Sequence, residues 1–166
     1  MTARERLTMR LSAVISPCGT WRYRLGRTWT DDAPSVAWVM LNPSTADETR
    51  DDPTIRRCMG FALNWGFGGI DVYNLFALRS RHTHSLVSAP DAIGPENDEW
   101  LRRIPAEQAV VVAWGSFTEK LGTRDKDVLE MFSGRKIECV GFTLRGYPRH
   151  PLYVPYKAAR ETFPAP

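Results

Sequence analysis

Four short, nearly continuous apolar runs are spaced along this chain, and segments of helical or irregular character separate them. The runs lie at Ser35–Leu41, Ile70–Leu75, Gln108–Trp114 and Ile137–Phe142. Runs of this length are typical of strands that are covered on both faces. Strands that alternate with helices form a sheet with helices packed on either side. We therefore predict an α/β fold, a three-layer sandwich around a mostly parallel central sheet.

The segments between the runs carry helical signals, of which the clearest spans Pro53–Trp65. Asp52 can cap this helix, and an apolar stripe at helical spacing runs from Ile55 to Leu63. We predict shorter helices over Pro95–Arg103 and Asp125–Phe132 and a terminal helix over Tyr156–Phe163. The segment 80–92 lacks a period and is predicted to be a long surface loop.

A β-hairpin is predicted before the first apolar run, at about residues 11–29. Its strands, Leu11–Ser16 and Trp21–Trp29, are joined by a turn that contains Pro17 and Gly19. Apolar and arginine residues alternate in the second strand, so we expect one apolar and one basic face. With a core at about 35–155, the hairpin makes a single domain of the 166 residues.

Composition excludes several classes of protein. No apolar run reaches the roughly 18 residues that indicate a membrane span. The charged N-terminus has no apolar stretch behind it, which argues against a signal peptide and favours a cytoplasmic protein. The net charge of +3 permits a nucleic-acid partner without requiring one. No oligomeric state is predicted.

The cysteine and aspartate patterns predict neither a metal nor a cofactor. Cys18, Cys58 and Cys139 are far apart, which argues against disulfides, zinc and an iron–sulfur cluster, and the last two are expected in the core. Asp51 and Asp52 fit no calcium loop, and helix capping is their expected role.

Polar residues follow each of the four predicted core strands. Ligands of open α/β sheets bind outside the carboxyl ends of the strands, so these residues are expected to share one rim. They include Asn42 after the first run, Asn74 at the end of the second and His150 in the loop after the fourth. Asn42 and Pro43 are also common turn residues, and His150 also fits an exposed loop. An unpaired buried Asn74 would cost about 1–3 kcal/mol, which favours a ligand for it.

Several motifs identify a known but uncharacterised family. LNPSTAD, DDPTIRRCMGFA, VYNLFALRS, AWGSF and GYPRHPLY together resemble a bacterial and phage domain of unknown function, over about residues 10 to 155. This resemblance implies no activity.

The same order of motifs resembles the uracil-DNA glycosylase superfamily. The stretch Met40–Ser44 is similar to the Gly-Ile-Asn-Pro-Gly stretch of mismatch-specific members, in which the Asn positions the attacking water. Asn74 matches the Asn that reads the base edge in several members, and His150 matches the His that stabilises the leaving base. Ser44 and Leu152 depart from the pattern, and no aspartate stands at Asn42 to act as a general base.

The resemblance implies a nucleobase-recognising protein with a uracil-DNA-glycosylase-like fold, which hydrolyses N-glycosidic bonds of modified or deaminated bases. Asn42 and His150 are then the catalytic residues. The expected substrate contacts are Pro43, Ser44, Asn74, Phe76 and Trp114. DNA or a nucleotide is the expected partner, and the expected phosphate contacts are Arg79, Arg145 and Arg149, for which a solvated surface is the alternative. The alternative functions are a non-catalytic nucleic-acid or nucleotide binding module, and an enzyme of free or phage-modified nucleotides.

Overall fold

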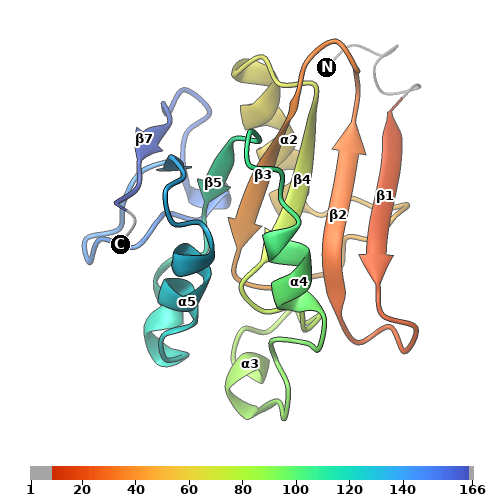
Figure 1. The fold of residues 1–166 in the computed structure, drawn as a ribbon, viewed down its shortest axis with the longest axis vertical. Coiled ribbons are helices and arrows are strands. Elements are labelled where there is room, and N and C mark those ends of the chain that lie inside the picture. The colour runs from red at the N-terminus through yellow and green to blue at the C-terminus, as the bar shows by residue number, and fades with distance from the viewer. Residues whose placement is uncertain (1–8, 165–166) are drawn as a thin grey trace.

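A seven-stranded sheet runs through the computed structural model, which describes residues 9–164 (Figure 1). Most of the N-terminal segment that argues against a signal peptide lies outside this range. The strands are β1 (Arg10–Ile15), β2 (Arg22–Thr28), β3 (Ser35–Met40), β4 (Gly69–Asn74), β5 (Val110–Val112), β6 (Ile137–Cys139) and β7 (Glu161–Thr162). The helices are α2 (Pro53–Asn64), α3 (Ser85–Ser88), α4 (Asn97–Arg102) and α5 (Arg124–Met131), with short 3-10 helices η1 (Ser116–Lys120) and η2 (Pro151–Tyr153).

The chain has an α/β fold, but its sheet is mixed and not mostly parallel as the sequence predicted. The strand order is β1-β2-β4-β3-β5-β6-β7, and only the four strands from β4 to β6 pair in parallel. The hairpin pairs through β2 with β4, and β7 pairs with β6, both antiparallel. Buried backbone groups need hydrogen-bond partners. The hairpin and β7 supply these partners at the two edges of the parallel core.

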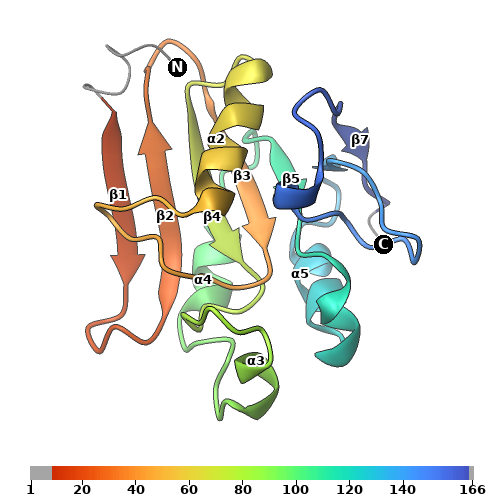
Figure 2. The ribbon, with the colours of Figure 1, turned by 180° about the vertical axis from the view of Figure 1, so that it is seen from behind.

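Helices cover both faces of the sheet. On one face α2 lies over β3 and β4 (Figure 2). Its buried stripe forms one core cluster with Trp38 and Val72 of these strands. On the other face α4 and α5 bury Leu101 and Val128 against β3 and β5. Among the helices of residues 9–164, none has the length and apolarity needed to cross a bilayer.

The helix predicted after Asp52 forms as its capping signal requires. Asp52 accepts a hydrogen bond from Ile55 N at 2.9 Å, and Pro53 occupies the first turn. Cys58 is buried on its inner stripe, and Cys139 is buried in β6, so both are core residues as predicted.

The terminal helix predicted over Tyr156–Phe163 is wrong. This segment is irregular up to Arg160 and then forms β7, and Phe163, directly after β7, donates from its backbone N to Ile137 O at 2.8 Å. Phe163 is buried edge-on against Trp114, with 5.9 Å between the ring centroids. Pairing with the edge of β6 and burial of this aromatic ring override the weak helical pattern.

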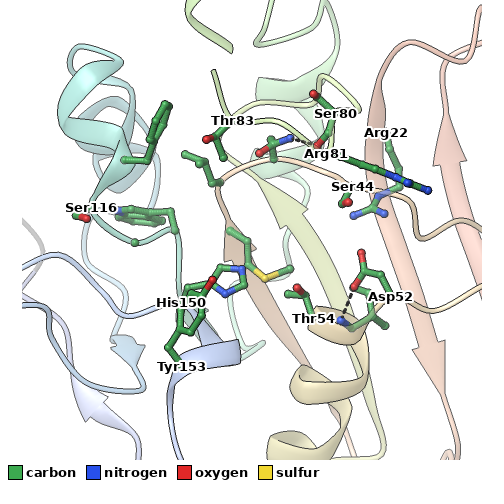
Figure 3. Close-up of a pocket in the computed structure, with 17 residues that line it drawn as sticks. Arg22, Ser44, Asp52, Thr54, Ser80, Arg81, Thr83, Ser116, His150 and Tyr153 are labelled. Atoms are coloured by element: carbon green, nitrogen blue, oxygen red, sulfur yellow. Dashed lines mark hydrogen bonds between the residues drawn. The ribbon is translucent and has the colours of Figure 1, made fainter. Parts of the chain in front are cut away.

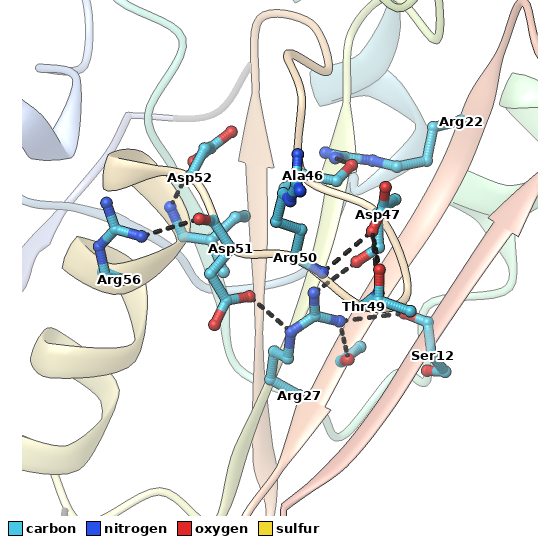
Figure 4. Close-up of polar contacts among 12 residues, drawn as sticks. Ser12, Arg22, Arg27, Ala46, Asp47, Thr49, Arg50, Asp51, Asp52 and Arg56 are labelled. Atoms are coloured by element: carbon cyan, nitrogen blue, oxygen red, sulfur yellow. Dashed lines mark hydrogen bonds and ion pairs between the residues drawn. The ribbon is translucent and has the colours of Figure 1, made fainter. Parts of the chain in front are cut away.

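The arginines of β2 do not form the one basic face that the sequence predicted, because Arg24 pairs with Asp71 whereas Arg22 and Arg27 contact the segment before α2. Arg22 and Arg27 of β2 are 2% and 0% exposed, because the segment that joins β3 to α2 covers them. Arg22 donates to Ala46 O, while Arg27 pairs with Asp51 and donates to Asp47 O (Figure 4). Two arginines of one strand therefore hold the loop that leads to α2.

Candidate functional site

A cavity of about 340 Å³ lies at the carboxyl ends of β3 and β5 (Figure 3). Its wall combines the end of β3, the start of α2, the loop 80–83, the segment 114–117 after β5, and η2. This is the position where open α/β sheets bind ligands, and the volume is in the range of small-molecule sites. Four residues predicted for the site line it: Asn42, Ser44, Trp114 and His150.

The nitrogen and the oxygen of the Asn42 side-chain amide have different roles. Its Nδ2 donates to Pro43 O at 3.0 Å and to Ser80 O at 2.9 Å. Its Oδ1 accepts no hydrogen bond from the residues that the structure describes, and Asn42 lines the cavity. The nitrogen therefore holds the rim loops together, while the oxygen remains an acceptor.

His150 precedes η2 and has a defined tautomer. Its Nδ1 accepts from Leu152 N at 3.4 Å, so in the neutral imidazole the proton is on Nε2. Burial lowers the pKa of His150 below 6.5, and the charge of Asp52 opposes this shift. At neutral pH the ring therefore presents an uncharged Nε2–H donor.

The lowered pKa of His150 predicts a dependence of stability on pH. The unfolded chain binds a proton at His150 more readily than the folded chain, so the free energy of unfolding falls as pH decreases from 6.5 through the lower folded pKa. Between about pH 7.5 and about pH 5, wild type should lose more thermal stability than His150→Gln, as measured by calorimetry. Equal losses in both proteins would contradict this assignment.

Asp52 is a residue whose place in the cavity the sequence did not reveal. It was expected only to cap a helix, and it does so through Oδ1, but it also lines the cavity. Figure 3 shows Asp52 and Thr54 on the side of the cavity opposite His150 and Tyr153. The other lining residues that the sequence did not single out for the site are Arg22, Met40, Leu41, Thr54, Ile55, Ser80, Arg81, Thr83, Gly115, Ser116, Phe117 and Tyr153. Most of them lie close to the end of a strand or to the start of α2 in the sequence, whereas Ser80, Arg81, Thr83 and Tyr153 come from segments farther along the chain.

Three predicted substrate contacts lie outside the cavity lining. Asn74 is 1% exposed, and its side-chain amide has no partner among the described residues. It pairs in the sheet with Met40, which lines the cavity. Phe76 is buried in the core on the α4 and α5 face, and Pro43 is buried with its carbonyl bonded to Asn42 and Ser80.

The three arginines predicted to contact phosphates also lie outside the lining. Arg79 donates to Gly19 O at 3.0 Å and so ties the hairpin turn to the loop after β4. Arg145 is paired with Glu119, and Arg149 donates to Tyr153 O at 3.1 Å. Arg145 and Arg149 line a separate surface hollow that shares Ser116 with the cavity.

Comparisons with known proteins place the chain in a family without assigning a chemistry. No curated protein and no solved structure matches it. A family model described as "Protein of unknown function (DUF1643)" matches residues 22–152, from Arg22 at the cavity wall to η2. The match covers most of the chain, which therefore belongs to this family.

Proposed function

We propose that the protein binds a nucleobase in this cavity and hydrolyses the N-glycosidic bond that links the base to its sugar. One observation carries the proposal. His150, a neutral Nε2–H donor, and the carboxylate of Asp52 lie on opposite sides of one cavity. Trp114 and Phe117 add aromatic surface to the same wall. A planar base with polar edges matches this combination of rings and hydrogen-bonding groups.

The chemistry follows from the charges that develop as the bond breaks. The sugar becomes positive and the base becomes negative, so a donor at the base and an acceptor at the attacking water lower the barrier. His150 Nε2–H is proposed to donate to a base oxygen. Asp52 uses Oδ1 to cap α2, which leaves Oδ2 to take a proton from water. Asn42 Oδ1 is proposed to orient that water.

The resemblance of the motifs to uracil-DNA glycosylases supports the same class of reaction. We propose that the central sheet and its rim correspond to the arrangement in that superfamily. Asn42 then corresponds to the Asn of its early motif, and His150 to the His of its late motif. The carboxylate that Asn42 does not provide is proposed to come from Asp52 at the start of α2. Modified or deaminated bases are the proposed substrates.

An incision assay tests the proposal. Single- and double-stranded oligonucleotides that carry uracil, hypoxanthine, xanthine or hydroxymethyluracil are incubated with the protein, and abasic sites are cleaved with alkali. The same bases are offered as nucleosides and mononucleotides, with release followed by chromatography. We expect release of at least one base, which His150→Gln reduces by about 100-fold. His82→Gln is the matched control, because His82 is exposed and lies outside the cavity lining. Release that His150→Gln leaves unchanged would contradict the proposed role.

Binding without hydrolysis is the second candidate. It is favoured by the three backbone carbonyls, of Pro43, Leu78 and Ser80, that the Asn42 amide contacts, because they give this residue a structural role. This candidate predicts affinity for nucleosides or DNA with no base released under any condition of the assay. Affinity for DNA that falls steeply with salt would identify a nucleic-acid module.

A further inference from the structure

Arg22 is a buried cation in the wall of the cavity. Its side chain comes from β2 and is 2% exposed. Nη1 donates to Ala46 O at 2.7 Å, whereas Nε has no hydrogen-bond partner among the described residues. A guanidinium has five N–H donors, so most of the donors of Arg22 remain unused in the described structure.

The two other buried arginines are neutralised by carboxylates, and Arg22 is not. Arg27 Nε lies 2.7 Å from Asp51, and Arg124 pairs with Asp98. No carboxylate of residues 9–164 lies within ion-pair distance of Arg22. Asp52 and Asp47 are near enough to favour its charge, but burial and the neighbouring cations Arg79 and Arg27 outweigh them, and the pKa of Arg22 falls to about 10.

The contrast between Arg22 and the two paired arginines points to a binding site for an anion. An unpaired buried charge is costly, and it persists in proteins where a partner or ligand compensates it. Arg22 remains protonated at neutral pH, because its pKa of about 10 is well above 7. The cavity therefore has a positive charge with free donors in its wall.

Ser44 and Arg81 add donors to the wall beside Arg22. Figure 3 shows Ser44 and Arg22 on the same side of the cavity, with Ser116 and His150 on the opposite side. The Ser44 hydroxyl makes no hydrogen bond to a described residue, and the Arg81 side chain is exposed. The side of the cavity opposite His150 thus has two guanidinium groups and a hydroxyl beside the single carboxylate of Asp52, and the other side is formed by His150 and aromatic rings.

We infer that Arg22, Ser44 and Arg81 form a phosphate subsite, so that the substrate is a nucleotide and not a free base or nucleoside. The inference rests on the proposed function for the base, while the phosphate contact is independent of hydrolysis. The two guanidinium groups and the hydroxyl donate to phosphate oxygens, and the base lies toward Trp114 and His150. The phosphate belongs either to a mononucleotide or to a DNA strand, since both present the same oxygens.

Calorimetric titration tests the subsite. The probes are the deoxynucleosides of the assay bases, their 5′-monophosphates, and single-stranded pentanucleotides with the same base at the centre. We expect the phosphorylated probes to bind wild type about tenfold or more tightly than the nucleosides, as charge-assisted hydrogen bonds in a buried site should give. Arg22→Gln should abolish this difference. Arg103→Gln changes an arginine that directly follows α4, pairs with Glu99 and lies outside the cavity lining, so this variant should retain the difference.

Two further variants keep the test valid if Arg22→Gln does not fold. Arg81→Gln and Ser44→Ala change an exposed and a half-buried side chain, and each should reduce the phosphate advantage several-fold with an unchanged melting temperature. A monophosphate that binds more tightly than the pentanucleotide would identify a free nucleotide as the source of the phosphate. The reverse order would identify DNA.

Inorganic phosphate separates this inference from the proposed function. If no nucleoside or nucleotide binds but phosphate raises the melting temperature of wild type and not of Arg22→Gln, the subsite stands and the nucleobase site fails. If nucleosides bind, phosphorylated probes bind equally well, and phosphate has no effect that depends on Arg22, the subsite is overturned while the nucleobase site stands. Absence of binding by every probe overturns both.

Discussion

Asp52→Asn is expected to lower the rate of base release by about 100-fold or more, the usual contribution of a general base. The amide has nearly the shape of the carboxylate but does not take a proton from water. Asparagine is also as good an N-cap as aspartate, so the hydrogen bond from Ile55 N and helix α2 should persist. The melting temperature should therefore stay close to that of wild type. Single-turnover kinetics on the best substrate of the incision assay measures the effect.

Two comparisons make the Asp52 result specific. Asp125→Asn removes a partly exposed carboxylate in the first turn of α5, outside the cavity lining, and should leave the rate unchanged. Asp52→Ala removes both the charge and the cap, so it should lose activity and also about 1 kcal/mol of stability. A rate for Asp52→Asn within a few-fold of wild type would rule out Asp52 as the base and would shift attention to a water held by Asn42.

Arg27→Met is expected to reduce the free energy of unfolding by about 3 kcal/mol, the lower end of the range for breaking a buried ion pair. The side chain is fully buried and donates to Asp51, to the carbonyls of Gly26 and Asp47, and more distantly to Ser12 O (Figure 4). Methionine fills similar volume but satisfies none of these acceptors. Asp51 is 22% exposed and regains some hydration, which places the loss at the lower end. Urea denaturation followed by circular dichroism measures it.

A matched pair on the neighbouring strand controls for this loss. Arg10 on β1 pairs with Asp31, and both side chains are largely exposed, so Arg10→Met should change the stability little. Arg27→Met/Asp51→Asn should be more stable than Arg27→Met alone, because it removes the carboxylate left without its partner. Equal destabilisation by Arg10→Met and Arg27→Met would show that burial of Arg27 does not determine how much this residue contributes to the free energy of unfolding.

The pH dependence assigned to His150 and the phosphate advantage assigned to Arg22 test different sides of the same cavity. An equal pH dependence of wild type and His150→Gln would contradict the lowered pKa of His150 without affecting the side of the cavity that holds Arg22. Loss of the second would restrict the substrate to an uncharged nucleoside or base. Together with the rate effect of Asp52→Asn, they distinguish a base-releasing enzyme from a binding module.

Local features of the sequence determined the central strands and helix α2. An apolar run such as Ser35–Leu41 specifies burial within a few consecutive residues, and Asp52 with Pro53 specifies a helix start in the same way. The rim was also predictable in part. Carboxyl ends of parallel strands meet at one edge, so Asn42 after β3 and Trp114 after β5 line one cavity.

The tertiary structure alone decided which polar side chains reach that cavity. Asn74 ends a central strand, yet its side chain is 1% exposed and does not line the cavity, although its register partner Met40 does. The β1–β2 register shifts between Val14 and Ile15, opposite Arg22 and Arg24, and such an irregularity changes the direction of neighbouring side chains. Arg22 contacts the loop before α2, while Arg24 pairs with Asp71. These outcomes depend on strand register and on contacts between distant segments, which the local pattern of residues does not encode, whereas strands, caps and turns depend on neighbours in the chain.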